Sequence, residues 1–188
     1  MRHLPNTLTI LRILLVPCFL VASMQRMFTL ALVIFVSAAL TDILDGTLAR
    51  RMNVRSRLGA LLDPAADKTL MICGFLYYTF AGGFPRIAIP GWLTFAVFIR
   101  DFLIVVFAYF MYTRIRISRF PPSFAGKAST LLQAVTLAIV IGVNGRLAVL
   151  QPLAQVLFRL SLVVTLYSGW DYMRRASLLL REESVAQA

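Results

Sequence analysis

The stretch FTLALVIFVSAALTDILDGTLAR, residues 28–50, decides the fold of this chain. Its apolar run, taken to residue 46, is long enough to cross a bilayer as a helix, which needs ~20 residues. Asp42 and Asp45 lie near one end of that run, where a charge facing lipid would cost ~2.5–3.5 kcal/mol. The stretch therefore predicts a membrane helix whose last turns carry two carboxylates that face protein or ligand.

Apolar runs of this length recur along the chain. Of the 188 residues, 60% are hydrophobic, whereas a soluble domain would be nearer to half apolar. Six runs are long enough to span a membrane as helices, which satisfy their own backbone hydrogen bonds in lipid: 8–25, 28–46, 58–80, 91–112, 128–146 and 152–173. We predict an all-α integral membrane protein with six transmembrane helices in a single domain, 1–188, whose polar C-terminal tail, about 177–188, frays.

The charges divide the predicted loops into two sets. The net charge is +11, from 17 Arg and two Lys against eight acidic residues. Most cations gather at one end of the predicted helices: Arg2, Arg50, Arg51, Arg55, Arg57, Arg114, Arg116, Arg119, Lys127, Arg174, Arg175 and Arg181. The loops at the other end carry one Arg each: Arg26, Arg86 and Arg146. The positive-inside rule therefore places both termini in the cytosol, and the basic face predicts contact with membrane lipids and not with nucleic acid.

Half of the acidic residues fall within 26 positions, 42–67. Asp42 and Asp45 are three residues apart, and Asp63 and Asp67 are four apart, so each pair projects from one face of a helix. The connecting stretch RRMNVRSR, 50–57, lets the second helix reverse into the third. Both pairs are then expected near the cytosolic ends of adjacent antiparallel helices.

Four carboxylates at close range need positive charge beside them. At 4 Å and an effective dielectric near 20, each like-charged pair costs about 4 kcal/mol. Oxygen-only ligands suit hard divalent cations, and two metals about 3.5–4 Å apart suit phosphoryl transfer. The acids therefore predict a site for two Mg²⁺ ions. The alternative is that they are solvated loop residues paired with nearby arginines, which leaves their helical spacing unexplained.

Small residues flank the acids. Gly46 and Ala49 each follow an aspartate by one turn, and Gly59 precedes Asp63 by one turn. These positions leave room for a bulky ligand against the backbone. Arg50 can form a bidentate contact with phosphate, and Ser56 supplies a hydroxyl from the connecting loop.

Residues 42–67 read Asp-x2-Asp-Gly-x2-Ala-Arg-x8-Gly-x3-Asp-x3-Asp, which resembles the signature of the CDP-alcohol phosphatidyltransferases. The resemblance implies that the four aspartates of the signature bind two divalent cations, Mg²⁺ or Mn²⁺, and that Asp67 is also the base that deprotonates the acceptor. It implies that the CDP moiety is bound by residues of the first three helices and their connection: Asn6, Gly46, Ala49, Arg50, Ser56 and Gly59. It further implies a homodimer in a bacterial inner membrane, with an active site that faces the cytosol.

The implied reaction uses CDP-diacylglycerol as the donor. The hydroxyl of a glycerol-containing acceptor attacks the phosphorus attached to diacylglycerol, and CMP leaves. Two branches compete for the acceptor. One uses glycerol 3-phosphate and forms phosphatidylglycerophosphate, and the other uses phosphatidylglycerol and forms cardiolipin.

The fourth and fifth spans favour the cardiolipin branch. Glycerophosphate enzymes commonly show Arg-Glu with a further Arg in the fourth span, where this chain has Arg100 and Asp101 and lacks the second Arg. They open the fifth span with Gly-Lys-x-Lys-Thr, where this chain has Ser129 in place of the second Lys. Fewer cations suit a less charged acceptor, although Arg114 and Arg116, with Arg119, could supply phosphate contacts.

Arg100 and Lys127 are the predicted acceptor contacts of these two spans. The alternative for Arg100 is an internal ion pair with Asp101, and for Lys127 it is anchoring to lipid headgroups. For Asp171 we expect an ion pair with Arg174 or Arg175.

Two other classes use related features. An intramembrane prenyltransferase also binds pyrophosphate through Asp-x2-Asp and Mg²⁺, but it carries two separated acidic motifs on a longer chain. A divalent-cation channel or transporter could use the acids as a selectivity site, but this leaves Gly46, Ala49 and Arg50 without a role.

Overall fold

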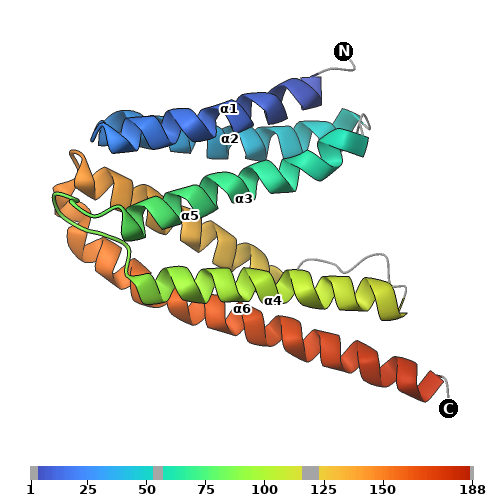
Figure 1. Ribbon diagram of the computed structural model, residues 1–188. Coiled ribbons are helices and arrows are strands. Elements are labelled where there is room, and N and C mark those ends of the chain that lie inside the picture. Colours follow the sequence, from blue (N-terminus) through green and yellow to red (C-terminus); the bar gives the residue numbers. More distant parts are fainter. Residues whose placement is uncertain (1–3, 53–56, 116–122, 187–188) are drawn as a thin grey trace. The chain divides into compact units, whose positions relative to one another are not determined.

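The computed structural model describes the backbone of residues 4–52, 57–115 and 123–186, and the side chains of residues 14–41, 68–107, 123–175 and 177. Within these ranges the chain is helical and has no strand, which confirms the prediction of an all-α fold. The helices are α1 (Leu4–Met24), α2 (Phe28–Met52), α3 (Arg57–Phe80), α4 (Gly91–Ile115), α5 (Phe124–Asn144) and α6 (Gln151–Ala186), with a short 3-10 turn, η1 (Ala148–Leu150), before α6 (Figure 1).

Each predicted span corresponds to one of these helices, with one marked difference in length. The helix α6 continues to Ala186 instead of ending near residue 173. The segment RRASLLLREE, 174–183, contains no Gly or Pro and is rich in Leu, Arg and Glu, which are good helix formers. The backbone therefore stays helical where the sequence analysis expects a frayed tail.

By length and composition, two segments of the described part could each cross a membrane. They are Phe124–Asn144 and Ala148–Arg175, and the apolar helical segments Leu14–Met24 and Phe28–Thr41 are shorter. The six-span count and the cytosolic termini stay predictions.

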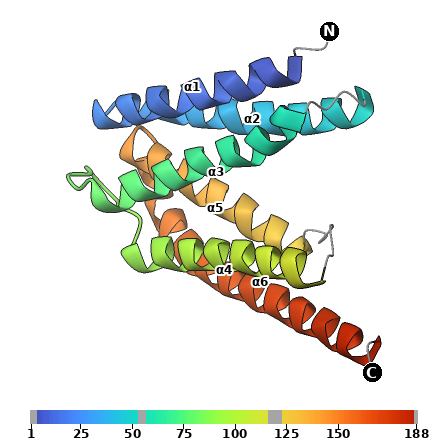
Figure 2. The same ribbon diagram turned by 45° about the vertical axis from the view of Figure 1, so that its right-hand side comes forward.

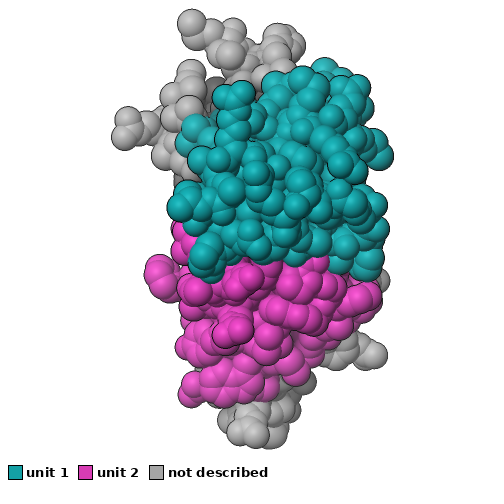
Figure 3. All heavy atoms as spheres, turned by 90° about the vertical axis from the view of Figure 1, so that its left-hand side faces the viewer, with its two compact units in different colours: residues 1–88, 137–152 teal, residues 89–136, 153–188 magenta. Residues whose placement is uncertain are grey.

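The chain divides into two compact units (Figure 3). Unit 1 contains residues 1–88 and 137–152, and unit 2 contains residues 89–136 and 153–188. Both α5 and α6 contribute residues to each unit, so the division does not follow whole helices.

In unit 1, α1 packs along both α2 and α3, and these three helices lie side by side in Figures 1 and 2. Aromatic rings form part of their core: those of Phe19 and Phe35 lie 6.0 Å apart, and Tyr78 stacks at 5.1 Å on Phe84, which follows α3. The hydroxyl of the fully buried Tyr78 lies 3.2 Å from Oγ of Ser23, which satisfies the polar end of the ring.

The turn from α1 to α2 brings these two helices together. Arg26 follows the last turn of α1 with a left-handed φ of 59°. The N–H groups of Arg26 and Met27 donate to the carbonyls of Ser23 and Ala22, at 3.1 and 2.9 Å. This pair of bonds is a Schellman motif, which ends a helix and usually places Gly at the left-handed position.

The segment between α3 and α4 is tied to the end of α5 through Asn144, which is 3% exposed. Its Oδ1 accepts hydrogen bonds from the backbone N–H groups of Arg86 (3.2 Å) and Ile87 (3.3 Å). Its Nδ2 donates to the carbonyls of Ile87 (2.7 Å) and Val140 (3.0 Å). In return, Nη1 of Arg86 donates to the carbonyls of Val143 (3.0 Å), near the end of α5, and Gly145 (2.7 Å), just after it, so a cation lies at the C-terminus of the helix.

Unit 2 buries a row of polar side chains beside apolar ones such as Leu93 and Phe158, and it exposes large apolar side chains. The buried side of α5 carries Ser129, Gln133 and Thr136, and that of α6 carries Ser161, Thr165 and Ser168; all six residues are at most 3% exposed. These six residues are called the polar seam below. The outer faces of α4 and α6 carry large apolar side chains, such as Phe102 (67% exposed) and Val163 (62% exposed). On the surface of a soluble protein the exposed helix faces are expected to be polar.

Candidate active site

The four aspartates of the 42–67 signature lie on two helices of unit 1. Asp42 and Asp45 lie ten and seven residues before the end of α2, and Asp63 and Asp67 lie six and ten residues after the start of α3. At 1.5 Å per residue, the two pairs lie at similar distances of about 9–15 Å along their helices from the connection at 53–56. Their side chains lie outside the described residues, so the metal site stays a prediction.

Three helix ends meet at this place in unit 1. The end of α2 and the start of α3 lie together near the first turns of α1 in both views of the ribbon (Figures 1 and 2). The backbone thereby gathers the predicted donor contacts at one end of three packed helices: Asn6 on α1, Gly46, Ala49 and Arg50 on α2, and Gly59 on α3. Their side-chain contacts lie outside the described residues, as does Ser56 altogether.

The donor set fits hard divalent cations by its chemistry. Each aspartate offers two carboxylate oxygens, which Mg²⁺ and Mn²⁺ prefer over nitrogen or sulfur. Among the side chains that the structure describes, no group of three or more His, Cys, Asp or Glu residues could hold a metal. The sequence signature, whose side chains are not among them, therefore carries the metal prediction alone.

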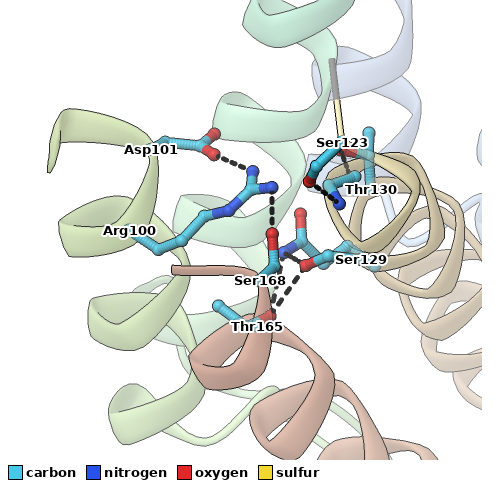
Figure 4. A network of polar contacts seen from close by, with 9 residues as sticks. Arg100, Asp101, Ser123, Ser129, Thr130, Thr165 and Ser168 are labelled. Atoms are coloured by element: carbon cyan, nitrogen blue, oxygen red, sulfur yellow. Dashed lines mark hydrogen bonds and ion pairs between the residues drawn. The ribbon is translucent and has the colours of Figure 1, made fainter. Parts of the chain in front are cut away.

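Unit 2 contains a buried cation, Arg100, which is 8% exposed. Its Nη1 lies 2.7 Å from Oδ1 of Asp101, and its Nη2 donates to Oγ of Ser168 at 2.6 Å (Figure 4). The internal ion pair that the sequence analysis gives as the alternative is thus present. Nε of Arg100 is also buried and has no hydrogen-bond partner among the described residues.

The first turn of α5 lies against the guanidinium of Arg100. Ser123 caps this helix, because its Oγ accepts the N–H of Gly126 at 3.0 Å. A Cβ placed on Gly126 would lie 3.2 Å from Nη2 of Arg100, so the guanidinium lies directly beside the helix N-terminus (Figure 4). The first turn of α5 contains no acid, and Lys127 in that turn is exposed. Two cations therefore adjoin the positive end of a helix dipole, an arrangement that suits an anion.

The remaining predicted residues are placed as follows. Arg114 lies in the last turn of α4 with its side chain outside the described residues, and Arg116 lies beyond the described backbone. Asp171 pairs with Arg175, whose Nε lies 3.1 Å from the carboxylate, which confirms one of the two predicted partners. Arg174 lies instead over the ring of Trp170, with its Cζ 5.7 Å from the ring centroid.

Apart from Ser129, the residues of the polar seam, Ser168 among them, were not predicted as a site from the sequence. Within the seam, Oγ of Ser129 and Oγ1 of Thr165 lie 3.2 Å apart, and Nε2 of Gln133 donates to both oxygens at 3.0 Å. A signal for it was present, because 129, 133 and 136 on α5 and 161, 165 and 168 on α6 repeat the same spacing of four and three. That spacing lines one face of a helix, and in an apolar span it indicates polar contact between helices.

Known proteins resemble this chain over most of its length. The model of the CDP-alcohol phosphatidyltransferase family matches residues 2–167. A Mycobacterium tuberculosis protein named probable phosphatidylglycerophosphate synthase is 33% identical over 183 residues, which cover 93% of this chain and 81% of the relative. The CDP-diacylglycerol–glycerol-3-phosphate 3-phosphatidyltransferase of Aquifex aeolicus is 31% identical, over 96% of this chain and 99% of its own length. The human cardiolipin synthase (CMP-forming) is 32% identical over 72% of this chain and 48% of its own.

Proposed function

The chain belongs to the CDP-alcohol phosphatidyltransferase family, and from this we propose that it transfers a phosphatidyl group from CDP-diacylglycerol to a hydroxyl of a glycerol-containing acceptor. The observation that carries the proposal is the complete aspartate signature, 42–67, on two helices whose ends meet at one end of unit 1. An enzyme of this class makes phospholipid, and its donor presents a pyrophosphate that needs positive charge around it.

The residues of the signature divide the chemistry between them. Asp42, Asp45, Asp63 and Asp67 hold two divalent cations, which supply positive charge to the pyrophosphate and the leaving CMP. Arg50 adds a guanidinium for the phosphates, and the small residues Gly46, Ala49 and Gly59 keep the backbone open to the nucleotide, with Asn6 and Ser56 as further contacts.

Asp67 has a second role as the base. It takes the proton of the acceptor hydroxyl while the acceptor oxygen bonds to the phosphorus attached to diacylglycerol. The bond from that phosphorus to the bridging oxygen of CMP breaks, and CMP leaves with the electron pair. The products are a phosphodiester lipid and CMP.

Phosphatidylglycerol is the proposed acceptor, with cardiolipin as the product. Two observations support this acceptor, which carries less charge than glycerol 3-phosphate. Asp101, at 2.7 Å, offsets the charge of Arg100. On α5, the buried, hydrogen-bonded Ser129 stands where glycerophosphate enzymes commonly have a second lysine. Lys127 and Arg100 are then the proposed contacts of the acceptor phosphodiester, aided by the N-terminus of α5. Arg114 and Arg116 are further candidates.

Glycerol 3-phosphate is the second candidate. The relatives named for phosphatidylglycerophosphate synthesis match 93% and 96% of this chain, whereas the human cardiolipin synthase matches 72%. The greater share of this chain that matches the phosphatidylglycerophosphate relatives favours glycerol 3-phosphate as the acceptor.

The reaction takes place at the cytosolic edge of a bacterial inner membrane, which the chain crosses six times with both termini in the cytosol. The buried polar seam and the apolar exposed faces of unit 2 support a lipid environment. The single Arg residues of the described turns after α1, α3 and α5 support the orientation, because the positive-inside rule leaves few cations on the outer side.

A comparison of acceptors tests the function and its two candidates. Purified protein with CDP-diacylglycerol and Mg²⁺ should release CMP on addition of phosphatidylglycerol, and the lipid product should have the mass of cardiolipin. Release with glycerol 3-phosphate alone would instead assign the second candidate. No CMP with either acceptor would contradict the family activity. A prenyltransferase would release pyrophosphate, and a channel would pass cations without binding nucleotide.

Removal of divalent cations should abolish the reaction. We expect CMP release to fall to background after treatment with EDTA, because four carboxylates without metal repel one another and the pyrophosphate. Excess Mg²⁺ or Mn²⁺ should restore it, and an excess of Na⁺ at equal ionic strength is the control. Activity that persists in EDTA would contradict the two-metal site.

A further inference from the structure

Arg100 is held in an orientation that costs free energy. Its guanidinium lies against the N-terminal turn of α5, beside Gly126, where the helix dipole disfavours a cation. It is also 8% exposed, so water does little to solvate it. Without neighbours that fix it, the flexible side chain would turn away from this position.

Two side chains hold the fork of Arg100, meaning the two terminal nitrogens of its guanidinium, from two directions. Asp101, the next residue of α4, accepts a hydrogen bond from Nη1 at 2.7 Å. Ser168 of α6 accepts one from Nη2 at 2.6 Å (Figure 4). The bond to Asp101 spans one residue in the chain, so it travels with α4 and cannot fix Arg100 against the other helices. The bond to Ser168 spans 68 residues and ties the guanidinium to α6.

Ser168 differs from its neighbours in the polar seam. Oγ of Ser161 lies 2.8 Å from Oγ1 of Thr136, and Thr165 bonds Ser129 and Gln133. These partners are neutral groups of α5, whereas Ser168 accepts from a charged donor, which makes a stronger bond. Ser161 and Ser168 are both 1% exposed, so they form a matched pair of buried hydroxyls with different partners.

Two glycines give Arg100 room to lie close to the backbones of α5 and α6. A Cβ on Gly126 would lie 3.2 Å from Nη2 of Arg100 and 3.9 Å from Oγ of Ser168, and a Cβ on Gly169 would lie 3.6 Å from Cγ of Arg100. The arginine stem thus packs along Gly169 of α6, and its fork fills the gap beside the first turn of α5.

We propose that Ser168 is a positioning residue for the acceptor: it fixes the guanidinium of Arg100 beside the N-terminus of α5, where Arg100 and Lys127 together receive the acceptor phosphate. The inference rests on the proposed function. Ser168 acts through Arg100 and does not touch the reacting atoms, so it affects binding of the acceptor and leaves the donor site of unit 1 unchanged.

The test compares Ser168→Ala with Ser161→Ala in the purified enzyme, with phosphatidylglycerol and glycerol 3-phosphate in separate assays. In the assay that supports turnover by the unaltered protein, Ser168→Ala should raise the KM for the acceptor about tenfold, the effect of one hydrogen bond to a charged group. Its kcat and its KM for CDP-diacylglycerol should stay within about twofold. The substitution weakens binding of the acceptor equally in the ground state and the transition state, and it leaves the chemical step unchanged. Ser161→Ala should change none of the three by more than about twofold.

A variant of the arginine separates positioning from a general structural effect. In an Arg100→Lys background, which lacks the fork, Ser168→Ala should add no further increase in KM, since residues that act together are not additive. An equal KM effect from Ser161→Ala, or a full tenfold effect of Ser168→Ala on top of Arg100→Lys, would overturn the inference. Ser168→Cys keeps the volume and weakens the bond, and gives the same readout if Ser168→Ala does not fold. Failure of the unaltered protein to release CMP would instead refute the proposed function.

Discussion

Asp67→Asn should lower the rate of CMP release from CDP-diacylglycerol by about 10³-fold or more. The amide cannot accept the proton of the acceptor hydroxyl, and general-base catalysis contributes typically 10²–10⁴-fold. The same change replaces one carboxylate of the proposed metal site by a neutral group. The amide keeps the size of the side chain, and three aspartates of the signature remain, so appreciable binding of CDP should persist.

The measurement is CMP release under saturating donor and acceptor, together with binding of CDP by calorimetry in the presence of Mg²⁺. Asp171→Asn is the control, because Asp171 lies on α6 in an ion pair with Arg175 outside the signature, and such a pair contributes little. We expect near-normal turnover from the control. Normal turnover by Asp67→Asn would show that the base is another residue.

Asn144→Ala should lower the stability of the protein by about 3 kcal/mol. The change removes four hydrogen bonds that join the end of α5 to Arg86 and Ile87 and to the carbonyl of Val140. Each bond contributes about 0.5–1.5 kcal/mol, and buried partners left without a bond cost more. For a chain of this length the loss corresponds to a midpoint of thermal unfolding lower by roughly 10 °C.

Thermal unfolding of the purified protein in detergent measures this effect. Arg146→Ala is the matched control, because Arg146 is exposed in the same turn, and its removal should move the midpoint by less than about 2 °C. Asn144→Asp keeps the acceptor for two N–H groups and loses both donated bonds, so its midpoint should lie between those of Asn144→Ala and the unaltered protein. Equal midpoints for Asn144→Ala and the control would show that the tie adds no stability.

The sequence predicted the helices well because their signal is local. The apolar runs alone place each of the six helices, and Ser123 marks the start of α5 through a bond to a residue three positions away. The extension of α6 to Ala186 did not follow from hydropathy, which falls after residue 173, whereas the helix propensity of 174–183 keeps the backbone helical.

The donor half of the site could be predicted from the sequence for a related reason. Its residues lie within 26 positions on two consecutive helices and are recognisable by spacing, and the chain's family is confirmed. The acceptor half could not be assigned in this way. Arg100 and Lys127 were selected as single cations, and nothing near either residue in the chain pointed to Ser168.

By itself, therefore, the sequence determined the helical class and the family, and it predicted the residues of the donor site, because helix period, span length and motif spacing are properties of adjacent residues. Only the tertiary structure decided that Ser168 bonds Arg100 and that Asn144 binds the segment before α4. These contacts join residues 68 and 57 positions apart, and they exist because particular helix faces and ends meet. Which residues meet depends on packing across the whole chain: the spacing of the polar seam marks one polar face on α5 and one on α6, but it does not name the partner of each residue.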